Sequence, residues 1–108
     1  MIGCPACSGV LQVQNGPHGH QQFVCSVGHA FGTESLYYAK EEELEQALWS
    51  ATALLEHLTM VLNMFDEQGQ PFLREDALRH RLRQIERHRV KIRSLIEETK
   101  LPEMEANP

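Results

Sequence analysis

The residues CPAC at positions 4–7 and CSVGH at positions 25–29 decide how this chain folds. Together they contain every cysteine of the protein. Two cysteines two residues apart, followed by a second pair of Cys and His, are typical of tetrahedral zinc sites, because thiolate and imidazole suit this ion. We therefore predict one structural Zn²⁺ per chain, with four ligands: Cys4, Cys7, Cys25 and His29.

The segment between the two pairs has the pattern of a β-hairpin. Val10, Leu11 and Val13 lead to a turn at Asn15-Gly16, and residues 22–24 return the chain to the second pair. A short hairpin clamped at one end by a metal is a zinc ribbon, which we predict for residues 1–33. A piece of this size buries too little apolar surface to fold alone, so we expect it to need its metal.

Other chemistries are compatible with the same residues. Cys-Pro-x-Cys also occurs in thiol–disulfide enzymes, although there the dithiol begins a helix. A disulfide would leave one of the three cysteines unpaired. A catalytic zinc needs a nearby general base, and residues 1–33 contain no Asp, Glu, Lys or Arg. The fourth ligand could be His18 or His20 instead of His29, and iron could take the place of zinc.

The hydrophobic pattern changes to a helical period after this segment. Apolar residues then recur at alternating steps of four and three: Leu44, Leu48, Ala51, Leu55, Leu58, Leu62 and Phe65. We predict a helix over residues 33–65, with Thr33 or Ser35 as its cap. Residues 66–71 end it, because Gly69 suits a helix C-terminus and Pro71 suits the first turn of a following helix.

A second amphipathic helix is predicted over residues 72–99. Its apolar positions have the same spacing, and only Arg89 interrupts them: Leu78, Leu82, Ile85, Ile92 and Ile96. Two such helices joined by a short connection pair antiparallel. The predicted fold is therefore a small α+β protein, with a zinc ribbon and short β-hairpin at residues 1–33, an antiparallel helical hairpin at 34–100 and a flexible tail at 101–108.

The two predicted helices carry opposite charge. Residues 34–67 have a net charge of −7, residues 71–96 one of +5 and residues 97–108 one of −3. Opposite charges favour the hairpin, although each exposed ion pair contributes only ~0–1 kcal/mol. The arginine-rich helix suggests a nucleic-acid surface, but the overall charge of −5 and the acidic neighbouring helix argue against it.

The first helix has a second apolar stripe away from its main seam. Trp49, Ala53, Met60 and Met64 form it, with His57 between them. Such a stripe is covered either by another part of the chain or by a partner. Since a two-helix hairpin is thin, we expect a homodimer in which two hairpins build a four-helix bundle and methionines fill the interface.

Several segments resemble one known element. These segments are CPACSGVL at residues 4–11, FVCSVGHAF at 23–31, ESL at 34–36 and EQALW at 45–49. They resemble the C-terminal zinc-ribbon and helical extension of chemotaxis CheB-type protein-glutamate methylesterases, over about residues 4–65. The esterase of that family is a separate domain with a Ser-His-Asp triad, and this sequence has no Gly-x-Ser-x-Gly elbow. The resemblance therefore implies the accessory module without the catalytic domain.

These observations predict a non-enzymatic, zinc-binding module that binds other proteins, in chemotaxis-like signalling. The alternatives are a zinc or redox sensor that uses the Cys4/Cys7 pair, and less favourably a nucleic-acid-binding protein that uses the second helix. Because no signal peptide or membrane span is visible, we expect a cytoplasmic protein with no membrane partner.

Overall fold

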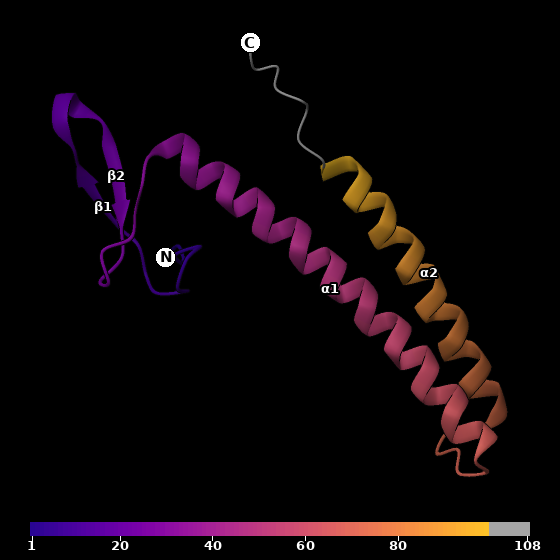
Figure 1. Cartoon of the computed structure of the whole chain (residues 1–108). Helices are drawn as coiled ribbons and strands as arrows, with labels where there is room; N and C mark the ends of the chain where they lie inside the picture. Colours follow the sequence, from indigo (N-terminus) through magenta and orange to yellow (C-terminus); the bar gives the residue numbers. More distant parts are fainter. Residues whose placement is uncertain (100–108) are drawn as a thin grey trace. The chain divides into compact units, whose positions relative to one another are not determined.

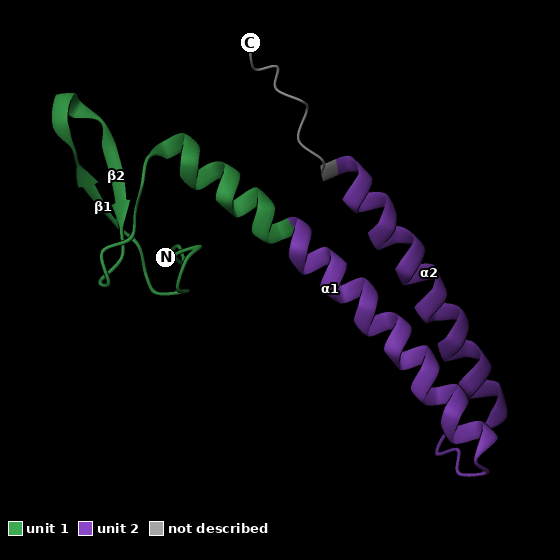
Figure 2. Ribbon diagram, viewed as in Figure 1, with its two compact units in different colours: residues 1–44 green, residues 45–108 purple. Residues whose placement is uncertain are grey.

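A computed structural model describes residues 1–99 of the chain (Figure 1). It confirms the predicted fold class: a small antiparallel sheet followed by two long helices that contact each other. The chain separates into two compact units, an N-terminal unit of residues 1–44 and a helical unit of residues 45–108 (Figure 2). This division falls after residue 44, inside the first helix. The boundary predicted from the sequence lies between residues 33 and 34, at the start of that helix. The predicted tail at 101–108 lies outside the described residues.

The sheet has three strands: β1 (Gln12–Asn15), β2 (Gln21–Val24) and β3 (Ala30–Phe31). Their order is β1-β2-β3 and both pairings are antiparallel. The predicted turn at Asn15-Gly16 is wider than expected, because a 3₁₀ turn, η1 (Pro17–Gly19), follows it. Proline fits the first position of such a turn. Strand β3 was not predicted, since two residues are too few to show an alternating pattern.

The core of the N-terminal unit is very small. Its buried residues are Cys4, Leu11, Cys25 and Leu36, with Phe23 and Phe31 packed against them half-buried. Two of the four buried side chains are therefore thiols of the predicted metal site. Leu36 belongs to the first turns of the long helix, so this helix contributes to the same core.

Helix α1 (Thr33–Glu67) is two residues longer than predicted. Gly32 precedes its first turn, and its carbonyl accepts a hydrogen bond from the backbone N–H of Leu36 at 3.0 Å. The predicted cap was wrong, because Thr33 and Ser35 both lie inside the helix. The helix ends at Gly69, which adopts a left-handed conformation with φ 72°. The backbone N–H of Gln70 reaches the carbonyl of Phe65, and that of Gly69 reaches the carbonyl of Asp66. These two bonds form a Schellman cap, as the glycine predicted.

Helix α2 (Glu75–Thr99) begins three residues later than predicted. Pro71 therefore lies in the connection and not in the first helical turn. The first turn starts at Arg74, whose carbonyl accepts the N–H of Leu78 at 2.8 Å. The aromatic rings of Phe65 and Phe72 meet edge to face across the connection, with centroids 6.3 Å apart. Helical periodicity does not predict this contact, in which Phe72 stays 71% exposed.

The two helices pack through the predicted seams. Leu62, Leu78 and Ile85 are buried together, with Leu55, Leu73 and Leu82 packed against them. Arg89, which interrupts the seam, turns its guanidinium to Glu86 in two hydrogen bonds of 2.8 and 3.1 Å. The bonds to Glu86 raise the pKa of Arg89, and the charge of Glu56 on α1 adds to this effect. No helix of the described residues is both long and apolar enough to cross a membrane.

Candidate metal centre

The first cysteine pair lies in a tight turn before β1. The backbone N–H of Ser8 donates to the carbonyl of Cys4 at 2.8 Å, and Ser8 itself has a left-handed φ of 67°. An isolated bridge between Gly3 and Val10 closes the loop from outside. The backbone N–H of Ala6 points at the sulfur of Cys4, at 3.4 Å. This arrangement turns both thiols of the pair toward the same point.

The second pair lies in the turn between β2 and β3. The backbone N–H of Cys25 bonds the carbonyl of His29 and the N–H of Gly28 bonds the carbonyl of Cys25, both at 3.0 Å. Gly28 adopts φ 109°, which side chains other than glycine rarely tolerate. The Cys-x-x-Gly-His spacing therefore builds a turn that returns His29 beside Cys25.

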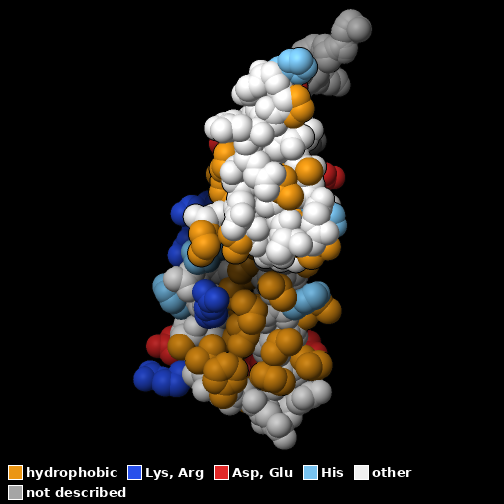
Figure 3. All heavy atoms as spheres, turned by 90° about the vertical axis from the view of Figure 1, so that its left-hand side faces the viewer, with side chains coloured by type: hydrophobic (Ala, Val, Ile, Leu, Met, Phe, Trp, Pro, Cys, Tyr) orange, Lys and Arg blue, Asp and Glu red, His pale blue; other side chains and the backbone are white. Residues whose placement is uncertain are grey.

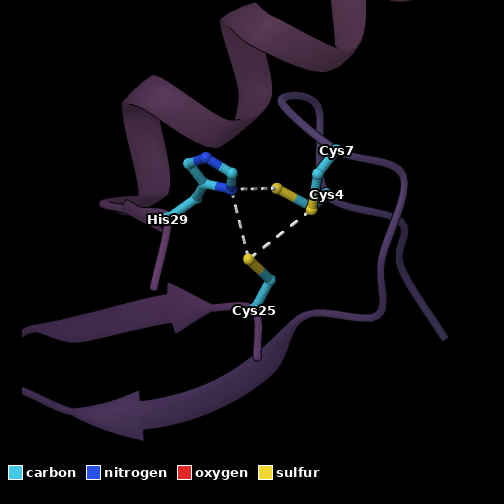
Figure 4. A group of neighbouring side chains, drawn as sticks. All are labelled: Cys4, Cys7, Cys25 and His29. Carbon is cyan, nitrogen blue, oxygen red and sulfur yellow. Dashed lines mark hydrogen bonds between the residues drawn. The ribbon is translucent and has the colours of Figure 1, made fainter. Parts of the chain in front are cut away.

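The structure brings the four predicted residues together (Figure 4). The donor atoms of Cys4, Cys7, Cys25 and His29 all lie within 4.8 Å of one another. The Sγ atoms of Cys7 and Cys25 are 3.7 Å apart. The Nδ1 atom of His29 lies 3.3 Å from the Sγ of Cys25 and 3.8 Å from the Sγ of Cys4. The imidazole thus faces the thiols through Nδ1.

These distances fit a tetrahedral zinc ion. Bond lengths of about 2.3 Å to sulfur and about 2.0 Å to nitrogen place two sulfurs about 3.8 Å apart, and a sulfur and a nitrogen about 3.5 Å apart. The observed separations of 3.3–3.8 Å lie around these values. Three thiolates and one imidazole are also the donor set of closed structural zinc sites. The cluster could therefore hold a metal ion such as zinc.

The thiols of the cluster differ in acidity. Burial would raise the pKa of the Cys25 thiol, but hydrogen bonds from the backbone N–H groups of His29 and Val27 and from the neighbouring side chains lower it to about 6. For Cys7, the backbone of Gly9 lowers the pKa, yet burial and the adjacent thiols outweigh it, so that the pKa is raised. Cys25 is therefore more ready than Cys7 to bind a cation as thiolate.

Two other histidines were considered for the fourth position. His18 and His20 lie at the tip of the β1–β2 hairpin, in and after η1, and both are exposed. Among the described residues, the one cluster of metal-binding groups contains His29 and neither of these two. His29 is held by the turn that also holds Cys25, which is why the Cys-His spacing was the better guide.

The geometry also bears on the competing chemistries. All three cysteines are free thiols, two buried and one, Cys7, exposed. The Cys4–Cys7 turn is followed by a strand, whereas a reactive dithiol is usually activated at a helix N-terminus. No carboxylate belongs to the cluster among the described residues.

Comparisons with known proteins add no relative to these observations. No protein-family model, no curated protein and no solved structure matches the chain. What is known of the cysteine–histidine cluster, the sheet and the two helices therefore comes from the structure alone. The resemblance to the extension of CheB-type methylesterases stays a prediction from the sequence.

Proposed function

We propose that this protein is a non-enzymatic zinc-binding module that docks other proteins through its helical hairpin, including copies of itself, in chemotaxis-like signalling. The observation that carries the proposal is the four-donor cluster, two of whose members, Cys4 and Cys25, belong to the core of the N-terminal unit. A zinc ion bound there would have four protein ligands and no open position for a substrate or an activated water. The metal would therefore serve folding, and the apolar helical surface would serve binding.

The composition of the small core supports a structural metal. Apart from two cysteines, only Leu11 and Leu36 are buried in the N-terminal unit. Without a metal, three thiols and an imidazole would converge with little apolar packing around them. Small domains of this kind gain their folding free energy from the bound ion.

The surface of the helical unit supports a binding role. Large apolar side chains of α1 remain exposed, among them Trp49, Leu54, Met60 and Met64. Figure 3 shows hydrophobic side chains gathered over the helices, with few charged groups among them. Exposed apolar patches of this kind mark sites of association with other proteins.

Native mass spectrometry combined with X-ray absorption at the zinc edge tests the metal role. We expect one zinc per chain, with three sulfur ligands and one nitrogen ligand in the first shell. Chelation should remove the sheet signals of the N-terminal unit in NMR spectra. An oxygen ligand in the first shell, or a folded sheet after complete removal of zinc, would contradict the proposal.

A sensor is the second candidate, and the exposure of one thiol supports it. Cys7 is exposed while Cys4 and Cys25 are buried, so an oxidant can reach one ligand of the cluster directly. Oxidation of Cys7 would weaken the metal site and unfold the N-terminal unit. Zinc release under mild peroxide, reversed by a thiol reductant, is expected of a sensor, and full retention of zinc counts against it.

A further inference from the structure

The outward side of α2 carries a row of cations. Arg79, Arg83, Arg87 and Lys91 follow one another at intervals of four residues, and all four are exposed. We call these four residues the cationic row. Residues four apart lie on one face of a helix, about 6 Å apart along its axis. Since Arg87 lies about 200° around the helix from Ile85, which is buried against α1, the row lies on the side of α2 away from α1.

Three members of the cationic row have no carboxylate partner. The first member, Arg79, pairs with Glu75 at 3.2 Å, one turn earlier in the same helix. The other three form no ion pair with any residue that the structure describes. Glu86 lies close to them in the chain, but Arg89 binds both oxygens of its carboxylate. These three cations are therefore available to an anion from outside the chain.

The neighbouring helix does not neutralise the row either. The net charges of the two helices suggested that an acidic helix lies along the basic one. However, seven of the eight acidic residues of α1 lie outside residues 46–65, the stretch that packs against α2. The one acidic residue within it, Glu56, acts on the pKa of Arg89, which is not part of the row. The row therefore keeps its charge within the folded hairpin.

The arrangement of these cations is unfavourable for an isolated helix. Like charges four residues apart repel each other, and the cationic row contains three such pairs in succession. Carboxylates between the cations would relieve the repulsion, yet residues 87–96 contain four cations and no carboxylate. A local arrangement that opposes folding is expected where the residues serve binding. An anionic partner would remove the repulsion.

The geometry of the row favours an acidic helix over a nucleic acid. Residues 45–99 contain eight Arg and Lys and nine Asp and Glu, so this unit lacks the net positive charge that attracts nucleic acids. No member of the row is aromatic, so no base can stack on it. Carboxylates at every fourth position of a helix form a ridge with the same step of about 6 Å. Two such ridges run side by side when helices cross at about −50°, the commonest packing class.

We propose that the cationic row docks an acidic helix of another protein, in which Asp or Glu recurs at every fourth position. This inference names the chemistry of a partner for the helical hairpin and rests on the proposed function. The guanidinium groups of Arg83 and Arg87 each bind one carboxylate through two N–H groups, and the ammonium of Lys91 binds a third. Because the row is exposed, salt screens the contact and weakens it.

Fluorescence anisotropy of a labelled probe peptide, titrated with the zinc-loaded full chain, tests this assignment. The probe is an alanine-based peptide, held helical by a covalent staple, with Glu at every fourth position. A second stapled peptide of the same composition has its Glu residues spread around all sides of the helix. We expect the probe to bind at low salt, about tenfold more tightly than the second peptide, and to be released as salt is raised.

Two variants of equal charge locate the binding surface. R83Q/R87Q removes two cations of the row, and R74Q/R93Q removes two exposed cations outside it. We expect R83Q/R87Q to lower the affinity for the probe by about tenfold and R74Q/R93Q to leave it within about twofold. The reversed variant R83E/R87E should lose the probe and bind a stapled peptide with Lys in place of Glu. Circular dichroism and zinc content confirm that all variants are folded.

Several results would overturn the assignment. A parent protein that does not bind the probe is one, and equal affinities of the parent and R83Q/R87Q are another. Tighter binding of a DNA duplex or of phosphatidylserine vesicles, lost in R83Q/R87Q, would assign the row to a different anion and overturn the proposal as well. In each case a zinc content of one per chain would leave the structural metal of the proposed function intact.

Discussion

The N-terminal unit and the helical unit reach a folded state by different means. In the first, two of the four buried side chains are cysteines, and only two are leucines. In the second, the buried apolar side chains are all aliphatic, at Leu62, Leu78, Ile85 and Ile96. We therefore propose that folding of the N-terminal unit depends on a bound ion, whereas folding of the helical unit depends on buried apolar area. Perturbations directed at one mechanism should leave the other unit folded.

Replacement of Cys25 should have the largest effect. Cys25→Ser removes a ligand and also a buried side chain, so the N-terminal unit should lose zinc and its folded sheet. The binding free energy at stake is on the order of 10 kcal/mol, as for other structural zinc sites. Loss of NMR dispersion for residues 1–31, with most helical circular dichroism retained, is the expected reading. The exposed neighbour Ser26→Ala is the control, and full zinc occupancy in Cys25→Ser would show that the ligand set is wrong.

Replacement of Cys7 should be milder than replacement of Cys25. Cys7 is exposed, so Cys7→Ser removes a ligand without opening the core. Zinc affinity should still fall by more than the ~10–100-fold that follows loss of an outer-shell partner. Competition with a chromophoric chelator measures the difference. If Cys7→Ser and Cys25→Ser lose the same zinc affinity, the burial of Cys25 adds nothing to its role as a ligand.

A cavity in the seam between the two helices should destabilise the helical unit and leave zinc binding unchanged. Ile85 is 1% exposed and packs with Leu62 and Leu78. Ile85→Ala should destabilise the helical unit by about 2–5 kcal/mol, because it removes buried apolar volume from a small core. Urea unfolding followed by circular dichroism measures this, and zinc affinity should be unchanged. Exposed Val90→Ala is the control on the same helix. A parallel loss of zinc would contradict the independence of the two units.

The smallest effect concerns the connection between the helices. Gly69 has φ 72°, and a β-carbon there would meet no neighbouring atom within 4 Å. The cost of Gly69→Ala is therefore conformational alone, about 1–2 kcal/mol for a left-handed residue. A lowered melting temperature of the helical unit, with zinc content unchanged, is expected. Gln68→Ala in the preceding position should be close to neutral.

Local features were well predicted because they depend on neighbours in the chain. The four residues of the cluster followed from the spacing of two pairs, and the Schellman cap followed from one glycine. Strand β3 and the late start of α2 were not predicted. Each depends on a contact with another segment: β3 with β2, and the residues before α2 with Phe65 through Phe72. Periodicity carries no information about such contacts.

The sequence by itself determined the donor set of the metal site, the two helical seams and the opposite charges of the helices, because residue type and spacing suffice for these. The tertiary structure adds the reason why His29, and neither His18 nor His20, joins the thiols: the Cys25–His29 backbone bond holds a turn that returns His29 beside Cys25. It also decided which apolar residues of α1 remain uncovered. That depends on the side of the helix taken by α2.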